Sequence, residues 1–174
     1  QFNKGIHIEE AKGRVRQEGT RYFLTKEGKL FADEVASELF PFTLTGAQER
    51  VIGEIFADME RAAPMNRLLQ GDVGSGKTVV AAIACLKAMA CGVQAAIMAP
   101  TEILARQHYQ SIERFLKGSK VRYELIVGGL TGKKRQAVLD RIARGKVDIV
   151  VGTIALIQAD IDFANLGLVV IDEQ

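Results

Sequence analysis

The chain has 174 residues, of which 48% are hydrophobic and 25% are charged, and its net charge is +2. This length is enough for one domain with a sizeable core, and the composition is typical of a soluble globular protein. No apolar stretch reaches the ~18 residues that a membrane-spanning helix needs, which excludes a membrane protein. The net charge is too small to indicate nucleic-acid binding on its own.

The positive charge is concentrated in one part of the sequence. Residues 101–148 contain 11 Lys or Arg and 5 Asp or Glu, a local charge of +6, which leaves −4 for the rest of the chain. An excess of this kind most often marks a solvated face, so it identifies no partner without further evidence.

The first residues and the cysteines indicate the context of the chain. The opening QFNKGIHIEE contains neither an initiator methionine nor a signal peptide, so we expect residue 1 to lie inside a longer protein. Cys85 and Cys91 lie six positions apart in a predicted helix, which turns the second thiol about 240° from the first. We interpret them as two buried thiols of a cytoplasmic protein rather than a disulfide or a metal pair.

The first third of the chain predicts mainly helices. Residues 1–40 suggest an extended piece at 21–25 and a helix at about 30–39 that Pro41 stops. Apolar residues from Val51 to Met59 then recur at helical spacing, so a second helix is expected between its N-cap, Thr45, and Pro64.

The remaining sequence alternates strands and helices. The predicted order is strand 66–70, loop 71–78, helix 79–91, strand 93–100, helix 101–118, strand 121–129, helix 133–145, strand 147–153, a short helical turn 154–160 and strand 166–173. The strands are continuous aliphatic runs, as expected of a parallel sheet covered on both faces. The sequence therefore predicts an α/β fold with five or more parallel strands flanked by helices, after a short, mostly helical N-terminal leader.

The glycine-rich loop GDVGSGKT matches the pattern G-x-x-x-x-G-K-[ST] between a predicted strand and a predicted helix. Its glycines allow backbone N–H groups to surround a phosphate, and the helix N-terminus favours an anion. In such loops the lysine reaches the β- and γ-phosphates and the hydroxyl binds Mg²⁺. We expect a nucleoside triphosphate to bind Gly71, Asp72, Val73, Gly74, Ser75, Gly76, Lys77 and Thr78.

Two adjacent acids end the last predicted strand, LGLVVIDE. An Asp at the end of a second parallel strand commonly supplies another oxygen for Mg²⁺. Asp172 is therefore expected to hold the ion through water, and Glu173 to orient or deprotonate the attacking water. The chain has no N-K-x-D sequence to read guanine, so these acids favour ATP hydrolysis coupled to motion over a GTPase.

Six segments carry a family resemblance in one order along the chain. They are PFTLTGAQERVIGEI (41–55), NRLLQGDVGSGKTVVA (66–81), MAPTEILARQHY (98–109), VGG (127–129), VDIVVGTIALIQ (147–158) and LGLVVIDEQ (166–174). Together they resemble the motifs of superfamily 2 helicases and translocases, and within them the RecG group, whose D-E-x-H box also has Gln in third place. One departure is Ile154, which stands where the family usually has His.

The resemblance implies a P-loop, RecA-like fold and an ATP-dependent DNA helicase that uses ATP and Mg²⁺. It puts Gln48 at the adenine-reading position, Lys77, Asp172 and Glu173 in catalysis, and Thr78 and Asp172 at the metal. The positions that it implies for the nucleic-acid backbone are Thr101, Arg106, Gln107, Gly128, Gly129 and Thr153. For Arg106 and Gln107 an ordinary exposed helix face is the alternative, and His108 is either a DNA or interdomain contact or a packing residue.

The resemblance also implies a domain organisation. Residues 1–40 would connect to an upstream wedge-like domain, and residues 41–174 would form the first RecA-like domain, truncated at motif II. The implied partners are branched or double-stranded DNA, such as stalled forks and Holliday junctions in recombination and repair, and the second RecA-like lobe and wedge of the same protein. The chain alone is expected to bind ATP–Mg²⁺ weakly and to hydrolyse almost none.

Two alternatives remain open from the sequence. The chain could be the equivalent lobe of an Mfd-like or PriA-like translocase. It could also be a module that binds a nucleotide without catalysis, although the intact Lys77, Thr78, Asp172 and Glu173 argue against this for the parent protein.

Overall fold

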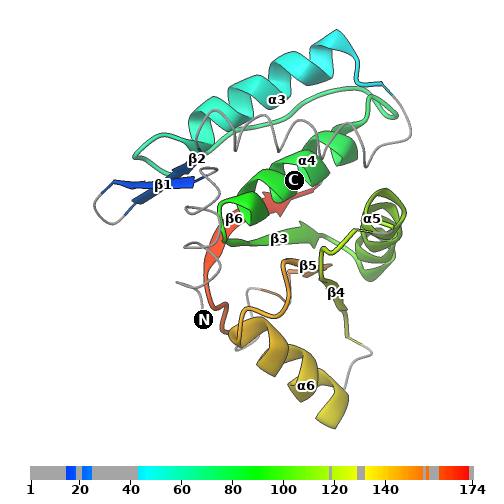
Figure 1. Ribbon diagram of the computed structural model, residues 1–174. Helices are drawn as coiled ribbons and strands as arrows, with labels where there is room; N and C mark the ends of the chain where they lie inside the picture. The colour runs from blue at the N-terminus through cyan, green and yellow to red at the C-terminus, as the bar shows by residue number, and fades with distance from the viewer. Residues whose placement is uncertain are drawn as a thin grey trace. The chain divides into compact units, whose positions relative to one another are not determined.

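The computed structural model describes residues 15–18, 21–24, 43–117, 119–128, 132–154, 156 and 161–172. The chain divides into two compact units, residues 1–91 and 92–174. The first contains strands β1 (Val15–Glu18) and β2 (Arg21–Leu24), paired antiparallel, and helices α3 (Gly46–Met59) and α4 (Lys77–Ala90) (Figure 1). The extended piece expected at 21–25 is confirmed, whereas the helix expected at 30–39 lies outside the described residues.

Helix α3 begins with a capping box. The hydroxyl of Thr45 accepts from the backbone N–H of Gln48 at 3.3 Å, and the Gln48 side-chain oxygen accepts from the backbone N–H of Thr45 at 2.9 Å. Two of the four N–H groups at this end are thereby satisfied. The helix buries Ile52 and Ile55, so both the predicted start and the predicted apolar face are confirmed.

Helix α4 is apolar on nearly every side, and nine of its 14 residues are buried. One buried position holds a lysine, Lys87, whose side chain is 1% exposed. Its ammonium donates to Glu60 Oε1 at 3.1 Å and lies 4.7 Å from the centre of the Phe56 ring. A carboxylate and an aromatic face compensate the charge, and they tie α4 to the C-terminal end of α3.

The segment between α3 and the glycine-rich loop is held by Arg67. Its guanidinium donates to Asp58 Oδ2 at 2.8 Å and to Glu54 Oε2 at 2.7 Å, both on α3. The Arg67 hydrogen bond keeps the pKa of Asp58 below its usual range. The chain that leads into the loop is therefore anchored to the face of α3 that carries these acids.

The second unit is built on a parallel sheet. Its strands are β3 (Gln94–Ala99), β4 (Tyr123–Ile126), β5 (Ile149–Thr153) and β6 (Leu166–Ile171), in the spatial order β4-β5-β3-β6 (Figure 1). Helices α5 (Glu102–Phe115) and α6 (Gly132–Ala143) connect strands within it. The predicted α/β architecture is confirmed, with shifts of a few residues at the element ends.

Two details of the predicted sheet are wrong. In the part of the chain that the structure describes, the sheet has four strands, and residues 66–70 form none of them. Leu68 in that segment is 77% exposed. Apolar residues form a strand only where a neighbouring backbone supplies hydrogen bonds, and here Arg67 ties the segment to a helix instead. Strand β6 is a sheet edge rather than a fully covered strand, with Ile171 49% exposed.

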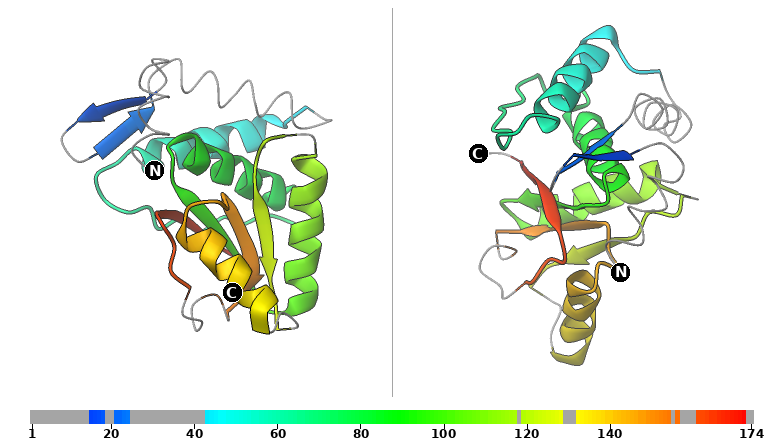
Figure 2. Two further views of the ribbon diagram at one scale, coloured as in Figure 1. Left: turned by 60° about the horizontal axis from the view of Figure 1, so that its bottom comes forward. Right: turned by 60° about the vertical axis from the view of Figure 1, so that its left-hand side comes forward.

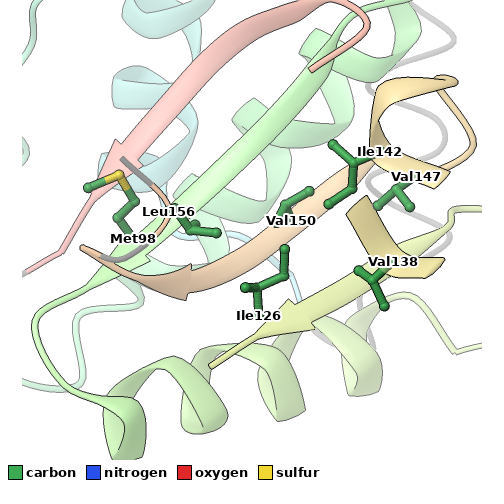
Figure 3. Close-up of a cluster of buried hydrophobic side chains, with 7 residues drawn as sticks. All are labelled: Met98, Ile126, Val138, Ile142, Val147, Val150 and Leu156. Carbon is green, nitrogen blue, oxygen red and sulfur yellow. The ribbon is translucent and has the colours of Figure 1, made fainter. Parts of the chain in front are cut away.

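Helices α5 and α6 cover opposite faces of this sheet (Figure 2). Along β3, Met98 packs in the cluster that includes α6, and the next residue, Ala99, packs in the cluster that includes Ala105 of α5. This alternation is the two-residue period of a strand. Figure 3 shows the α6-side cluster, which consists of Met98, Ile126, Val138, Ile142, Val147, Val150 and Leu156.

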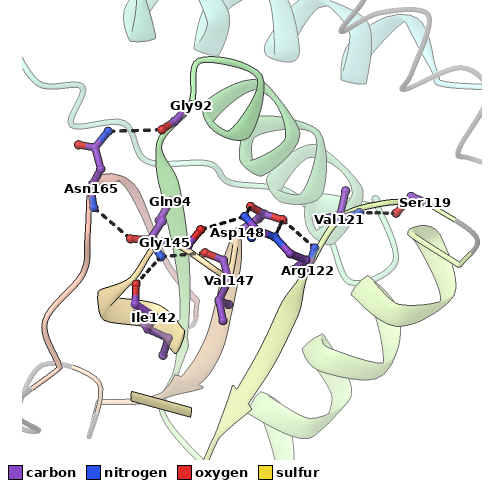
Figure 4. Close-up of polar contacts among 10 residues, drawn as sticks. All are labelled: Gly92, Gln94, Ser119, Val121, Arg122, Ile142, Gly145, Val147, Asp148 and Asn165. Carbon is purple, nitrogen blue, oxygen red and sulfur yellow. Dashed lines mark hydrogen bonds and ion pairs between the residues drawn. The ribbon is translucent and has the colours of Figure 1, made fainter. Parts of the chain in front are cut away.

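A buried amide joins the elements at the amino ends of the strands. Gln94, 5% exposed, donates to the carbonyls of Ile142 at 3.1 Å and Val147 at 2.7 Å, and its oxygen accepts from Asn165 N–H at 3.0 Å (Figure 4). The end of α6, the start of β5 and the turn before β6 therefore share one side chain. Because every polar group in this set is paired, its burial carries no desolvation penalty for an unpaired group.

Two further findings concern the cysteines and the membrane. Cys85 and Cys91 are both free thiols, as predicted, with Cys85 buried and Cys91 only partly so. Burial raises the pKa of Cys85 to about 12, so its thiol stays protonated and unreactive. Among the described residues, no helix has the length and hydrophobicity to cross a membrane.

The Gln94 network gives a first prediction. Gln94→Met keeps the volume but removes the donor to the Val147 carbonyl and the acceptor of the Asn165 N–H, whereas the Ile142 carbonyl still accepts from the Gly145 N–H. The free energy of unfolding should therefore fall by about 2–4 kcal/mol. The matched control is Gln136→Met on the exposed side of α6, which should change it by less than about 0.5 kcal/mol. Urea unfolding of both variants measures this, and equal stabilities would contradict the role of Gln94.

The Arg67 anchor predicts a pH dependence. The pKa of Asp58 is lower in the folded state than in the unfolded state. The stabilisation that the ionised Asp58 gains from Arg67 is therefore complete above the unfolded-state pKa. It is lost as the pH falls through the folded-state pKa. Arg67→Gln should therefore lower the melting temperature at pH 7. The difference in melting temperature between this variant and the parent should become smaller below about pH 4.

The control for that experiment is Arg61→Gln. Arg61 also reaches Asp58, but at 3.5 Å and with a side chain that is 75% exposed, so its loss should have a smaller effect. A melting-temperature difference for Arg67→Gln that stays constant from pH 7 to pH 3 would refute the ionic origin of the anchor.

Candidate functional site

The predicted site residues divide between the two units. Gln48 and the glycine-rich loop belong to the first unit, whereas Asp172 and the positions expected to contact nucleic acid belong to the second. Gly129 and Glu173 lie outside the described residues.

The glycine-rich loop has a backbone that only glycine adopts easily. Gly74 and Gly76 have φ angles of 83° and 84°, in the left-handed region that side chains disfavour. Between them the chain turns back, and the N–H of Ser75 donates to the carbonyl of Asp72 at 3.1 Å. Residues 71–75 are exposed. The loop is therefore accessible from solvent, and its binding of a phosphate stays a prediction.

Helix α4 begins directly after this loop without a side-chain cap. Its N-cap residue, Gly76, has no side chain that could accept from the first N–H groups. The other two helices with resolved caps differ, since Thr45 caps α3 and Thr101 caps α5 through their hydroxyls. The N–H groups at the start of α4, together with the positive end of its dipole, are therefore suited to an anion.

Lys77, the first residue of α4, folds back over the loop. Its ammonium donates to the carbonyl of Gly71 at 2.7 Å and to that of Asp72 at 3.0 Å. The cation is thereby held above the loop that is expected to surround phosphates. These two carbonyls are weaker partners than a phosphate oxygen, because bonds between two charged groups are the stronger ones.

Gln48 links the start of α3 to the loop. Its side-chain nitrogen donates to the carbonyl of Ser75 at 2.9 Å, while its oxygen completes the capping box of α3. A Cβ atom added to Gly76 would lie 2.3 Å from that nitrogen, so a side chain at this position would displace the Gln48 amide. The expected adenine-reading residue therefore contacts the glycine-rich loop itself, a contact that its sequence position did not indicate.

Three of the expected nucleic-acid positions share one edge of the sheet. Thr101 follows β3, Gly128 follows β4 and Thr153 ends β5, and these strands are parallel neighbours. Open α/β sheets bind ligands at this carboxyl edge. The hydroxyl of Thr101 is already used as the N-cap of α5, where it accepts from Leu104 N–H at 3.3 Å.

Two more of these positions lie in the first turns of α5. Arg106 and Gln107 are exposed, and Arg106 donates to Glu102 Oε1 through two nitrogens, at 2.6 and 3.2 Å. The arginine is therefore oriented by an acid of its own helix, one turn earlier, and retains exposed N–H groups. Ile154, which replaces the family histidine, is 50% exposed just beyond β5.

Asp172 has a partner that the sequence did not reveal. Its backbone N–H donates to the carbonyl of Met98 at 2.9 Å, and its Oδ2 lies 2.6 Å from Nε2 of His108 on α5. From the sequence, His108 could be either a DNA or interdomain contact or a packing residue. The available signal was its spacing, since it falls on the buried face of α5 between Ala105 and Ile112.

The described residues contain no group of three or more His, Cys, Asp or Glu side chains that could hold a metal ion by themselves. The candidate magnesium ligands, Thr78 and Asp172, are one hydroxyl and one carboxylate. Each is a kind of oxygen ligand that fits Mg²⁺, which keeps several waters and is commonly held by one or two protein oxygens together with substrate phosphates.

A family model supports this reading of the chain. The model of the DEAD/DEAH box helicase family matches residues 45–174. The match begins at the N-cap of α3 and includes the glycine-rich loop and Asp172.

Relatives and a solved structure agree with it. The chain is 51% identical over 139 residues to the ATP-dependent DNA helicase RecG of Aquifex aeolicus, covering 80% of this chain and 18% of that protein. It is 44% identical over 173 residues to RecG of Streptococcus pneumoniae, covering 99% of this chain and 25% of that protein. The chain thus spans about a fifth to a quarter of the length of these curated relatives.

The solved structure of RecG bound to a three-way DNA junction matches 98% of this chain and 22% of its own, with a TM-score of 0.79 and 43% sequence identity. The predicted resemblance to RecG is therefore confirmed in sequence and in fold. With the family model matching 45–174, this chain belongs to the DEAD/DEAH box helicase family.

Proposed function

We propose that this chain is the ATP-binding half of a DNA-translocating helicase that remodels branched DNA. The observation that carries the proposal is the loop geometry: two left-handed glycines lead into the uncapped N-terminus of α4, with the Lys77 ammonium held over the loop. Family membership and the similarity to RecG support it. The proposed partners are branched or double-stranded DNA and the second RecA-like lobe and wedge domain of the full-length protein.

Each residue has a proposed task in ATP hydrolysis. The loop N–H groups and Lys77 would bind the phosphates, Thr78 and Asp172 would hold Mg²⁺, and Gln48 would bind adenine. Glu173 would orient or deprotonate the attacking water. The bound Mg²⁺ would neutralise charge on the phosphate oxygens. When ATP binds, Lys77 would exchange its two loop carbonyls for phosphate oxygens, so the carbonyl bonds keep the loop compact without nucleotide.

In this proposal, DNA binds at the carboxyl edge of the sheet in the second unit. Hydroxyl groups, backbone N–H groups and an arginine bind the phosphate backbone without reading sequence, as a translocating motor requires. The local charge of +6 in residues 101–148 favours this assignment. The proposed contacts are Thr101, Arg106, Gln107, Gly128, Gly129 and Thr153.

Lys77→Ala in the full-length protein tests the nucleotide site. ATP turnover should fall by at least about a hundredfold, because a cation that stabilises the transferring phosphate is lost. The melting temperature without nucleotide should stay close to that of the parent, since the lysine is bonded only within the loop. Lys120→Ala, an exposed lysine beyond the amino end of β4, should keep full turnover.

A second variant separates binding from hydrolysis. Glu173→Gln should still bind a fluorescent ATP analogue but stop turnover, because only the base is removed. Full turnover by this variant would exclude Glu173 as the base. Negligible turnover by the parent, combined with tight ATP binding, would instead favour a non-catalytic nucleotide-binding module.

Arg106→Ala tests the DNA face. It should weaken binding of forked DNA by a similar factor for every sequence and reduce the slope of log K against log salt by about 1. Arg114→Ala, on an exposed position in the last turn of the same helix, is the matched control and should leave the slope unchanged. Equal slopes for both variants would remove Arg106 from the DNA interface.

A further inference from the structure

His108 lies where a polar ring needs a partner. It is on the buried face of α5, three residues after Ala105 and four before Ile112, both of which are 0% exposed. Its own side chain is 14% exposed. A ring N–H that is largely withdrawn from water costs free energy unless an acceptor receives it.

The acceptor is the carboxylate of Asp172, 64 positions later in the sequence. The distance from Nε2 to Oδ2 is 2.6 Å, which is short, as expected when the acceptor is charged. Because a carboxylate accepts, the ring presents its Nε2–H form to this oxygen. The bond connects a helix on one face of the sheet to the residue that follows β6.

The backbone and the side chain of Asp172 are thus held by different partners. Its backbone N–H extends the ladder between β3 and β6 by one bond, to the Met98 carbonyl at 2.9 Å. Its side chain, 30% exposed, is held through Oδ2 by His108, which leaves Oδ1 to accept from another donor. An aspartate fixed in this way has already lost the rotational freedom that binding would otherwise cost.

We propose that His108 is a positioning residue for Asp172, which orders the carboxylate so that its second oxygen can accept from a water bound to Mg²⁺. The proposal rests on the function proposed above for Asp172. Partners that orient a metal-binding carboxylate commonly contribute 10–100-fold in metal affinity or activity. His108 itself does not contact the ion or the nucleotide in this proposal.

The same helix makes the assignment more specific. Arg106 and Gln107, the two residues before His108, are exposed and are proposed to contact DNA. Three consecutive residues of α5 therefore serve the DNA surface and the ATPase acid. An ordinary packing residue at position 108 would fill space equally well without a donor, so the role is tested by whether a donor is required.

The experiment uses the full-length protein with two substitutions of His108. His108→Leu removes the donor, whereas His108→Gln places an amide N–H at a similar reach. For His108→Leu, the Mg²⁺ concentration for half-maximal ATPase should rise by about tenfold or more and kcat should fall. His108→Gln should recover most of both. Gln110→Leu, the same kind of change on an exposed position of α5, should match the parent.

A second readout does not depend on turnover. Mn²⁺ binding in the presence of a non-hydrolysable ATP analogue, followed by electron paramagnetic resonance, should weaken in His108→Leu and recover in His108→Gln. Binding of the analogue in EDTA should be equal in all variants. If both variants keep the parental Mg²⁺ and Mn²⁺ affinities, or if His108→Gln is as defective as His108→Leu, the positioning role is refuted.

Asp172→Asn separates this proposal from the one on which it rests. If Asp172→Asn keeps normal Mg²⁺ dependence and turnover, the metal role of Asp172 is wrong. If it loses both while His108→Leu behaves like the parent, only the positioning role is wrong. When both roles hold, the double variant should be no worse than Asp172→Asn, because His108 acts only through that carboxylate.

Discussion

The parallel pairing of β3 on both sides is the constraint on which the second unit depends. Its backbone forms ladders with β5 and β6 at once, so the three strands must end at the same edge. Thr101, Thr153 and Asp172 are close to that edge because of the pairing alone. A register shift of one residue would turn each side chain to the other face, and the two helices that cover the faces exclude such a shift through their packing.

The two edges of the sheet are stabilised in different ways. At the amino edge, Gln94 satisfies two carbonyls and one N–H in a buried position, and Arg122 donates to the carboxylate of Asp148 at 2.5 Å. The Gln94 bonds are buried, whereas the Arg122 side chain is 51% exposed. At the carboxyl edge, Thr153, Arg106 and Asp172 remain partly or fully exposed. The amino-edge bonds hold the strands in register, and the exposed carboxyl edge is the part of the sheet on which the proposed function depends.

In the first unit, the same side chains stabilise the fold and form the loop site. Gln48 caps α3 and donates to the loop, and Lys77 satisfies two loop carbonyls. Arg67 anchors the segment that enters the loop to α3. A loop with two left-handed glycines has little local preference for one conformation, so its shape depends on these contacts. In the proposed function, a bound phosphate would replace the two bonds of Lys77.

The sequence by itself determined most elements, because aliphatic runs, the Thr45 cap and the G-x-x-x-x-G-K-T pattern are local signals. Helices α3 to α6 and strands β3 to β6 followed from them, as did the position of the glycine-rich loop. The prediction of a strand at 66–70 was wrong, because a strand forms only when another strand lies beside it, and the residues of the segment do not specify that neighbour. The contact between His108 and Asp172 was also invisible, since a histidine on a buried helix face has the same spacing whether it packs or donates. Only the tertiary structure decided that point, by placing a carboxylate 64 residues away within 2.6 Å of its ring.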